Sequence, residues 1–164
     1  ALVSTGEAAK LLSVSRQHVV DLCDRGELAF VRIGSHRRIR TADIARMQNP
    51  LTRDEERSLW LHEVVLGHLL MDPQRVLAIA RGNIERWKSL HRSDGKSAAY
   101  LTEWEEVIGR GIDDVRRILI GTDRLSIELR QNSPFSGVLS RDERAKVLRS
   151  FHEHQNELHN SVVA

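Results

Sequence analysis

The first chemistry that the sequence offers is hydrogen bonding to base edges and ion pairing with phosphates. Arg16, Gln17 and His18 follow Ser15 at the start of an expected helix. An arginine matches the two acceptors of guanine in the major groove, and a glutamine matches the donor and acceptor of adenine. The stretch 32–40 holds four arginines and one histidine and contains no acidic residue. Such a basic stripe is typical of a surface that binds a polyanion, and the alternative is a solvated hairpin.

Positive charge is concentrated at the start of the chain. Residues 1–50 carry eight basic and five acidic side chains, whereas residues 51–164 carry 17 basic and 18 acidic ones. The net charge of +2 therefore comes from the first segment. The candidate DNA-binding residues form two sets, one at the helix start and one in the basic hairpin: Ser15, Arg16, Gln17 and His18, and Arg32, Ser35, His36, Arg37, Arg38 and Arg40.

Local signals predict the helices that must position the first set. Ser4 and Glu7 have the spacing of a capping box, which predicts a first helix. After a tight turn, Ser15 can cap a second helix that runs to about Arg25. Gly26 is placed to end this helix in a left-handed conformation. The polar first turn of the second helix is therefore expected to face solvent.

The second set falls on a predicted hairpin. The runs 29–33 and 37–40 alternate around the turn 34–36, as a two-stranded ribbon requires. Thr41 is then placed to cap a third helix. Two helices joined by a tight turn, with a polar first turn on the second, have the geometry that enters a major groove. The basic ribbon that follows would contact phosphates or the adjacent minor groove as a wing.

The rest of the chain predicts helices. The composition changes near Pro50, which disfavours a helical Asn49, so we place a domain boundary between residues 50 and 51. Helices are predicted, from capping signals and apolar spacing, over residues 52–71, 73–87, 101–108, 112–119, 123–130 and 140–151. The polar tail 152–164 is expected to fray. The predicted fold is mainly α: a winged helix-turn-helix with a small two-stranded wing over residues 1–50, and an all-α domain for partner binding and dimerisation over residues 51–164.

An irregular segment separates the last two predicted helices. It combines one charge, two amide side chains, a rigid proline and apolar groups: Arg130, Gln131, Asn132, Pro134, Phe135, Val138 and Leu139. In one interpretation these residues bind a partner, with Phe135 inserted as an apolar anchor. In the other, Phe135 and Leu139 fill the core of this chain itself.

Several classes of protein are excluded or disfavoured. No apolar run approaches the ~18 residues that span a bilayer, and the N-terminus lacks the pattern of a secretory signal, so we expect a cytoplasmic protein. The single cysteine, Cys23, excludes an internal disulfide and four-thiolate zinc sites. Tail histidines 152, 154 and 159 lack further ligands at suitable spacing. No nucleophile, base and orienting group assemble, so we expect no enzyme, cofactor or metal site.

The N-terminal part of the sequence resembles a known family. Four runs in the same order are similar to the excisionase-type winged helix-turn-helix of the mercury-resistance regulator (MerR) superfamily: 4–12, 14–16, 26–28 and 32–40. The resemblance covers residues 2 to about 48. It implies that residues 15–18 lie at the major groove and that Arg37, Arg38 and Arg40 belong to the wing. Asp21 departs from the pattern, because relatives often carry a basic residue there.

A DNA-binding domain followed by a helical domain that contains a segment like 128–140 is an arrangement similar to that of bacterial type II antitoxins. This resemblance implies a cognate toxin, commonly a PIN-domain ribonuclease, that the chain neutralises. It also implies repression of their shared operon at a double-stranded operator, with the protein at the nucleoid when bound. One winged module covers only one half-site, so a homodimer is expected. The alternatives are an effector-responsive MerR-like transcriptional regulator and an excisionase-like architectural protein.

Overall fold

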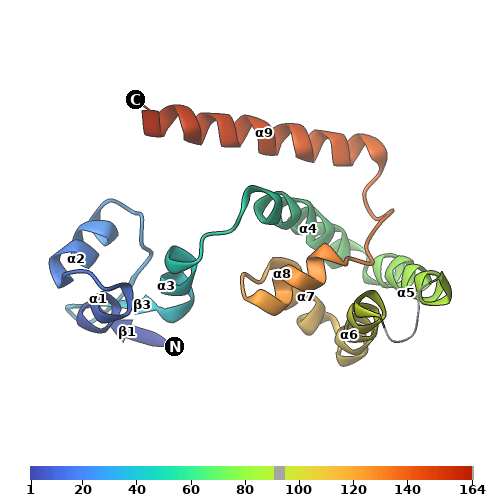
Figure 1. Ribbon diagram of the computed structural model, residues 1–164, viewed down its shortest axis with the longest axis horizontal. Coiled ribbons are helices and arrows are strands. Elements are labelled where there is room, and N and C mark those ends of the chain that lie inside the picture. The colour runs from blue at the N-terminus through green and yellow to red at the C-terminus, as the bar shows by residue number, and fades with distance from the viewer. Residues whose placement is uncertain (91–94, 164) are drawn as a thin grey trace. The chain divides into compact units, whose positions relative to one another are not determined.

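The computed structural model describes residues 1–90 and 95–163. The chain divides into two compact units, Ala1–Leu51 and Thr52–Ala164 (Figure 1). The first unit combines short helices with a small sheet, and the elements within the described residues of the second are all helices, which confirms the predicted mainly α fold. None of the helices in the described ranges is long and apolar enough to cross a bilayer.

The N-terminal unit contains three helices and three strands. In chain order they are β1 (Leu2–Ser4), α1 (Thr5–Leu12), α2 (Arg16–Asp24), β2 (Val31–Ile33), β3 (His36–Arg40) and α3 (Thr41–Gln48). The predicted ribbon is present as β2 and β3, and a two-residue turn joins them in which Gly34 has a φ of 62°. Such a positive φ favours glycine. The ribbon is not alone, however, because β1 pairs antiparallel with the other edge of β3 to give the order β1-β3-β2.

Capping interactions fix the ends of the first two helices as the sequence predicts. The Ser4 side chain accepts a hydrogen bond from the backbone N–H of Glu7, and the Glu7 carboxylate accepts one from the N–H of Ser4. Ser15 caps α2 by accepting from the N–H of His18 at 3.1 Å. Gly26 follows α2 with a φ of 74°. Thr41 does not cap α3 as expected, because it is the first helical residue and its hydroxyl donates to the carbonyl of Ala1.

The core of this unit orients α2 on the sheet. The residues that meet there come from α1, α2, β3, α3 and the loop after α2: Ala8, Ala9, Val19, Leu22, Cys23, Leu28, Ile39 and Ile44. Val19, Leu22 and Cys23 lie at helical spacing, so they fix which face of α2 is buried. Burial raises the pKa of the Cys23 thiol, which keeps it protonated in the core. The first turn of α2 is left in solvent.

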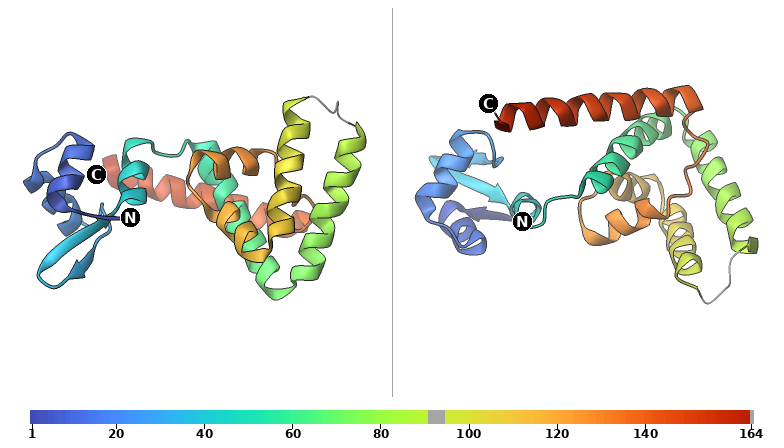
Figure 2. Two further views of the ribbon diagram at one scale, coloured as in Figure 1. Left: turned by 90° about the horizontal axis from the view of Figure 1, so that it is seen from below. Right: turned by 45° about the horizontal axis from the view of Figure 1, so that its top comes forward.

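The second unit is helical over its described residues. Its helices are α4 (Arg53–Met71), α5 (Pro73–Leu90), α6 (Lys96–Arg110), α7 (Ile112–Ile120), α8 (Arg124–Gln131) and α9 (Arg141–Val163). α5 and α6 lie side by side, and α4 contacts α5, α7, α8 and α9 (Figure 2). Trp104 is fully buried and its Nε1–H donates to the carbonyl of Leu129 at 2.8 Å. The indole thus ties α6 to α8 without an unpaired buried donor.

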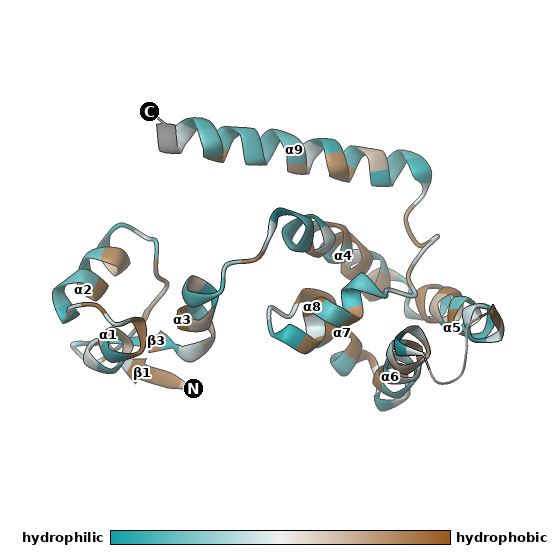
Figure 3. Ribbon diagram, viewed as in Figure 1, coloured by the Kyte–Doolittle hydropathy of each residue, from teal (hydrophilic) through white to brown (hydrophobic). Residues whose placement is uncertain are grey.

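The expectation that the last helix ends at Phe151 is wrong. α9 continues as one helix to Val163, through a stretch that contains neither proline nor glycine. Polar contacts hold part of this stretch on α4: Arg53 donates to Nδ1 of His152 at 2.6 Å, and Gln155 donates to Glu56 at 2.9 Å. Hydrophilic residues dominate α9 (Figure 3). A solvated polar face is compatible with a helix when side-chain contacts support it.

The segment between α8 and α9 is part of the core. Phe135 is 3% exposed, and its ring meets the Trp104 ring edge-on with 5.2 Å between centroids. Val138 is buried as well, and Asn83 donates to the carbonyls of Pro134 and Ser136, each at 2.8 Å. The expectation of an exposed anchor at Phe135 is therefore wrong, because satisfied backbone carbonyls and apolar neighbours hold the segment inward. The alternative interpretation, that Phe135 and Leu139 pack against their own core, agrees with the structure.

The other residues of the predicted partner-binding set are divided by burial. Arg130 is buried and donates through Nη1 to the carbonyls of Ile118 and Gly121, at 2.8 and 2.6 Å. Pro134 is buried, Asn132 and Leu139 are half-buried, and Gln131 is exposed. Contact with a partner stays a prediction for the three that retain exposed surface.

Candidate nucleic-acid interface

The first turn of α2 presents three polar side chains to solvent. Arg16, Gln17 and His18 are exposed, while the next residue, Val19, is fully buried. This is the geometry required of a recognition helix, whose N-terminal residues contact base edges. Ser15 precedes them, and because its Oγ accepts the capping bond, its hydroxyl hydrogen remains free to donate.

Two of these side chains are already oriented by neighbours. Arg16 donates from Nε to the Thr5 hydroxyl at 3.2 Å, which leaves its two terminal nitrogens for a base or phosphate. Gln17 donates from Nε2 to the Asp21 carboxylate at 2.9 Å, one helical turn further on. Asp21, the departure from the family pattern, thus holds the Gln17 amide, and one amide hydrogen and the amide oxygen stay available for adenine.

The strand pairing separates the wing arginines onto two faces. Arg32 lies opposite Arg37, and Val31 lies opposite Arg38, so the two pairs point to opposite sides of the ribbon. Arg37 shares its face with buried Ile39, whereas Arg38 and Arg40 share the other face. The basic stripe is therefore not one uniform surface.

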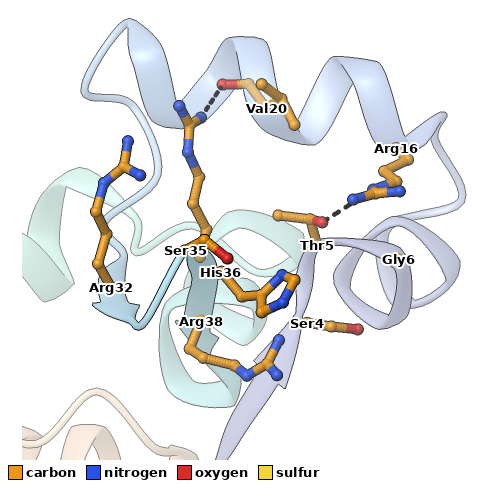
Figure 4. A pocket seen from close by; sticks show the side chains of 10 residues that line it. Ser4, Thr5, Gly6, Arg16, Val20, Arg32, Ser35, His36 and Arg38 are labelled. Atoms are coloured by element: carbon orange, nitrogen blue, oxygen red, sulfur yellow. Dashed lines mark hydrogen bonds between the residues drawn. The ribbon is translucent and has the colours of Figure 1, made fainter.

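Arg37 is tied to the recognition helix. Its Nη1 donates to the carbonyl of Val20 at 3.2 Å, drawn as a dashed line in Figure 4, and its Nη2 lies 2.7 Å from the Asp24 carboxylate. Its guanidinium also stacks 4.9 Å from the centre of the Phe30 ring. These contacts use the charge of Arg37 to position the wing against α2. The expected role of Arg37 as a free phosphate contact is in this respect incomplete.

A cleft of about 520 Å³ joins the recognition helix to the wing. It is lined by residues of the start of α1, of α2 and of the hairpin: Ser4, Thr5, Gly6, Arg16, Val20, Arg32, Ser35, His36, Arg37 and Arg38 (Figure 4). Four of the ten carry a permanent positive charge and none is acidic. The cleft thus brings together six of the ten predicted DNA-binding residues, and Ser15, Gln17, His18 and Arg40 lie outside its lining.

One carboxylate lies close to this cleft. The backbone and hydroxyl hydrogen bonds from Ser4 hold the pKa of Glu7 below its usual value, so Glu7 is ionised at neutral pH. It offsets part of the charge of Arg38, which also favours the ionised form. The remaining acids near the wing are engaged, since Asp24 pairs with Arg37 and Glu27 with Arg25 at 2.7 Å.

Sequence reasoning missed the residues that position the arginines. Thr5, Val20, Asp24 and Phe30 hold Arg16 or Arg37, and none was among the candidates. The sequence carried a signal for the contact of Phe30 with Arg32, two positions on, whose guanidinium lies 5.9 Å from the ring centre, but none for its contact with Arg37. The contacts from Thr5 and Val20 depend on how α1 and the wing meet α2, which no local pattern encodes.

Comparison with known proteins supports the interpretation of the N-terminal unit as a helix-turn-helix domain. Residues 2–50 match the family model described as a helix-turn-helix domain, which spans nearly all of the N-terminal unit. Searches of curated proteins and of solved structures found no match for the chain. The match and the exposed first turn of α2 together support a helix-turn-helix DNA-binding protein.

The contacts of Arg37 predict an effect on the wing. In an Arg37→Ala variant, amides of β2 and β3 should exchange with deuterium up to about tenfold faster, because a part-buried hydrogen bond worth ~0.5–1.5 kcal/mol and the ion pair with Asp24 are lost. Arg38→Ala is the matched control on the opposite face and should leave the exchange rates unchanged. Equal protection in the two variants would show that Arg37 does not hold the wing.

Proposed function

We propose that the N-terminal unit binds double-stranded DNA sequence-specifically, with the first turn of α2 in the major groove and the wing beside the phosphates. The observation that carries this proposal is that exposed Arg16 lines an arginine-rich cleft and that exposed Gln17 follows it in the first turn of α2. Base contacts from α2 supply specificity, and Arg32, Arg38 and Arg40 supply affinity that does not depend on sequence. Arg37 contributes mainly by holding the wing in place.

The two roles separate in a binding experiment. An operator is first selected from random double-stranded DNA, and affinity is then measured for the operator and for unrelated DNA at several salt concentrations. Arg38→Ala should weaken binding to both and reduce the slope of log K against log salt by about one. Arg16→Ala should cost ~1–3 kcal/mol on the operator and little on unrelated DNA.

The control is Lys10→Ala, which removes an exposed positive charge from α1 that does not line the cleft. This control should leave the base preference unchanged. It should change the slope of log K against log salt by no more than a few tenths. If Arg38→Ala altered base preference and left the salt slope intact, the roles of wing and helix would have to be exchanged.

We further propose that the chain acts as an antitoxin that represses its own operon as a dimer. The support is the resemblance of residues 4–40 and 128–140, together with a second unit that has its own hydrophobic core. A PIN-type ribonuclease is the favoured toxin. Because Phe135 is buried, the toxin must contact other residues of the helical unit, and exposed Gln131 with half-buried Asn132 are the candidates from the predicted segment.

Co-expression with the product of the neighbouring gene tests this role. The wild-type chain should restore growth of cells that produce the toxin, and Gln131→Arg should lose at least tenfold in toxin affinity, because the longer charged side chain disrupts a packed contact. Operator binding by the toxin-free variant should be unchanged. A neighbouring gene whose product is harmless, or a chain that fails to restore growth, would leave only the DNA-binding proposal.

A further inference from the structure

The helical unit contains a second cleft, of about 420 Å³, that the DNA-binding role does not use. Its walls come from α4, from the end of α8, from the segment between α8 and α9, and from the first turn of α9. Leu61, Val65, Phe135 and Leu139 give it an apolar part. Its charged lining is unbalanced, with three guanidinium groups and one carboxylate, from Arg57, Arg130, Arg144 and Asp54.

The single lining carboxylate does not neutralise the three arginines. Asp54 lies 3.4 Å from Arg57, and its side chain is 84% exposed, so this pair is a solvated ion pair at the mouth. The Arg144 side chain makes no ion pair or hydrogen bond with residues 1–90 and 95–163, and its backbone N–H donates to the Ser140 carbonyl at 2.9 Å. Arg130 and Arg144 therefore add two positive charges to the lining that no lining carboxylate balances.

Arg130 has an unpaired hydrogen-bonding edge. It is only 3% exposed, and while Nη1 donates to two carbonyls at the end of α7, Nε and Nη2 have no hydrogen-bond partner among the described residues. Nε and Nη2 form one edge of the planar guanidinium, the edge that binds two oxygens of a carboxylate or phosphate in parallel. Buried donors without partners are costly, so such an edge calls for an acceptor.

The other carboxylates that act on Arg130 lie outside the cleft. Asp123, Glu55 and Glu63 favour the charged form of Arg130, against the burial that lowers its pKa. None of the three lines the cleft. Asp123 is occupied by the N–H and hydroxyl of Ser126, and Glu55 by Arg124 at 3.2 Å. Arg130 thus stays a cation next to a cleft with spare positive charge.

His62 also lines this cleft, as an uncharged residue. Nδ1 donates to the Ser58 carbonyl at 2.6 Å, so Nε2 accepts from the Ser133 hydroxyl at 2.7 Å and the ring is neutral. Burial is the main cause that lowers its pKa to about 4, and the positive charges of Arg130 and Arg144 lower it further. The positive charges of Arg130 and Arg144 thus both act on His62, which lines the same cleft.

We propose that this cleft binds a small organic anion, a carboxylate or phosphate ester with an apolar body. The anionic group would take the free edge of Arg130 and the guanidinium of Arg144, and the apolar body would lie against Phe135 and Leu139. Ser136 also lines the cleft, and its hydroxyl can donate a further hydrogen bond. The proposal is independent of the antitoxin role, and it gives the helical unit a ligand that DNA binding does not require.

Calorimetric titration of the full chain with benzoate, phenyl phosphate and benzamide tests the proposal. Benzamide has the shape of benzoate without its charge, and comparison of the first two separates carboxylate from phosphate recognition. We expect at least one anion to bind with a Kd of about 1 mM or tighter, and benzamide at least tenfold more weakly. The Arg144→Ala variant should lose about tenfold in affinity for the anion, and its exposed position should leave the core intact.

Arg141→Ala is the matched control, since Arg141 is exposed on the same helix turn and does not line the cleft. Its anion affinity should equal that of the wild type. A second readout is the His62 imidazole followed by NMR, whose pKa should rise when a bound anion offsets the nearby guanidinium charges. Binding that persists in Arg144→Ala places the anion elsewhere, for example at the arginines of the N-terminal unit, and overturns the proposal. Equal affinity for benzamide, or no binding of either anion, overturns it as well.

Discussion

Replacing Phe135 with alanine is expected to lower the free energy of unfolding of the helical unit by about 3–5 kcal/mol. The ring is 3% exposed and meets Trp104 at 5.2 Å and His62 at 6.5 Å, both edge-on. Truncation removes the apolar surface that this ring buries and leaves a cavity that Asn83 and its two carbonyl partners prevent from closing. Chemical denaturation followed by the near-UV circular dichroism of the tryptophans, which all lie in the helical unit, measures the effect.

Two further variants make this prediction specific. Phe135→Leu fills part of the cavity and should recover more than half of the loss. Ser136→Ala, at the exposed neighbouring position, should stay within about 0.5 kcal/mol of the wild type. An exposed anchor would behave in the opposite way, with stability unchanged and only partner binding reduced. A loss below about 1 kcal/mol in Phe135→Ala would therefore contradict the packing described here.

Acid is expected to destabilise the helical unit through His62. This residue is 7% exposed, and its pKa is about 4 in the folded chain against 6.5 for the ordinary value. The unfolded chain therefore binds a proton more readily than the folded one, so the contribution is complete above pH 6.5 and is lost as pH falls towards 4. The full difference is up to about 3 kcal/mol, at 1.36 kcal/mol per pH unit.

Denaturation of the wild type and of His62→Gln between pH 7.5 and 4 isolates this contribution. Protonation of carboxylates with lowered pKa values, such as Asp123, also lowers the free energy of unfolding in acid. This loss is the same in the wild type and the variant. The wild type should lose up to about 3 kcal/mol more than the variant over this range. Parallel curves would mean that His62 takes up its proton as readily in the folded chain as in the unfolded one, and the hydrogen bonds to Ser58 and Ser133 would have to be reassigned.

The two clefts differ in what their arginines require. In the N-terminal cleft, Arg37 is already held by Asp24, Val20 and Phe30, while Arg16, Arg32 and Arg38 retain groups that face solvent. Such cations suit a large, hydrated polyanion whose phosphates release counterions on binding. In the helical unit, Arg130 is buried and lacks partners on one edge. That arrangement suits a single anionic group that can be desolvated.

The sequence by itself determined the features that depend on neighbours three or four residues apart. Ser4 with Glu7, Ser15 with His18, and Thr52 with Glu55 form the capping bonds that begin α1, α2 and α4. These bonds join groups within one helical turn, so spacing alone predicts them. The alternation around Gly34 likewise predicted the ribbon, and polar residues after Ser15 predicted the exposed turn of α2.

Only the tertiary structure decided which side chains these elements bring together. Arg37 is separated from Asp24 by 13 positions, and nothing in the sequence distinguishes Arg37 from the other arginines of the basic stripe. The strand pairing directs its side chain towards α2. Phe135 follows a proline in an irregular segment without a period, so nothing local distinguished a core residue from an exposed one. Phe135 is a core residue because it packs against Trp104. Helices far apart in the sequence form this contact, so only the tertiary structure shows that Phe135 is buried.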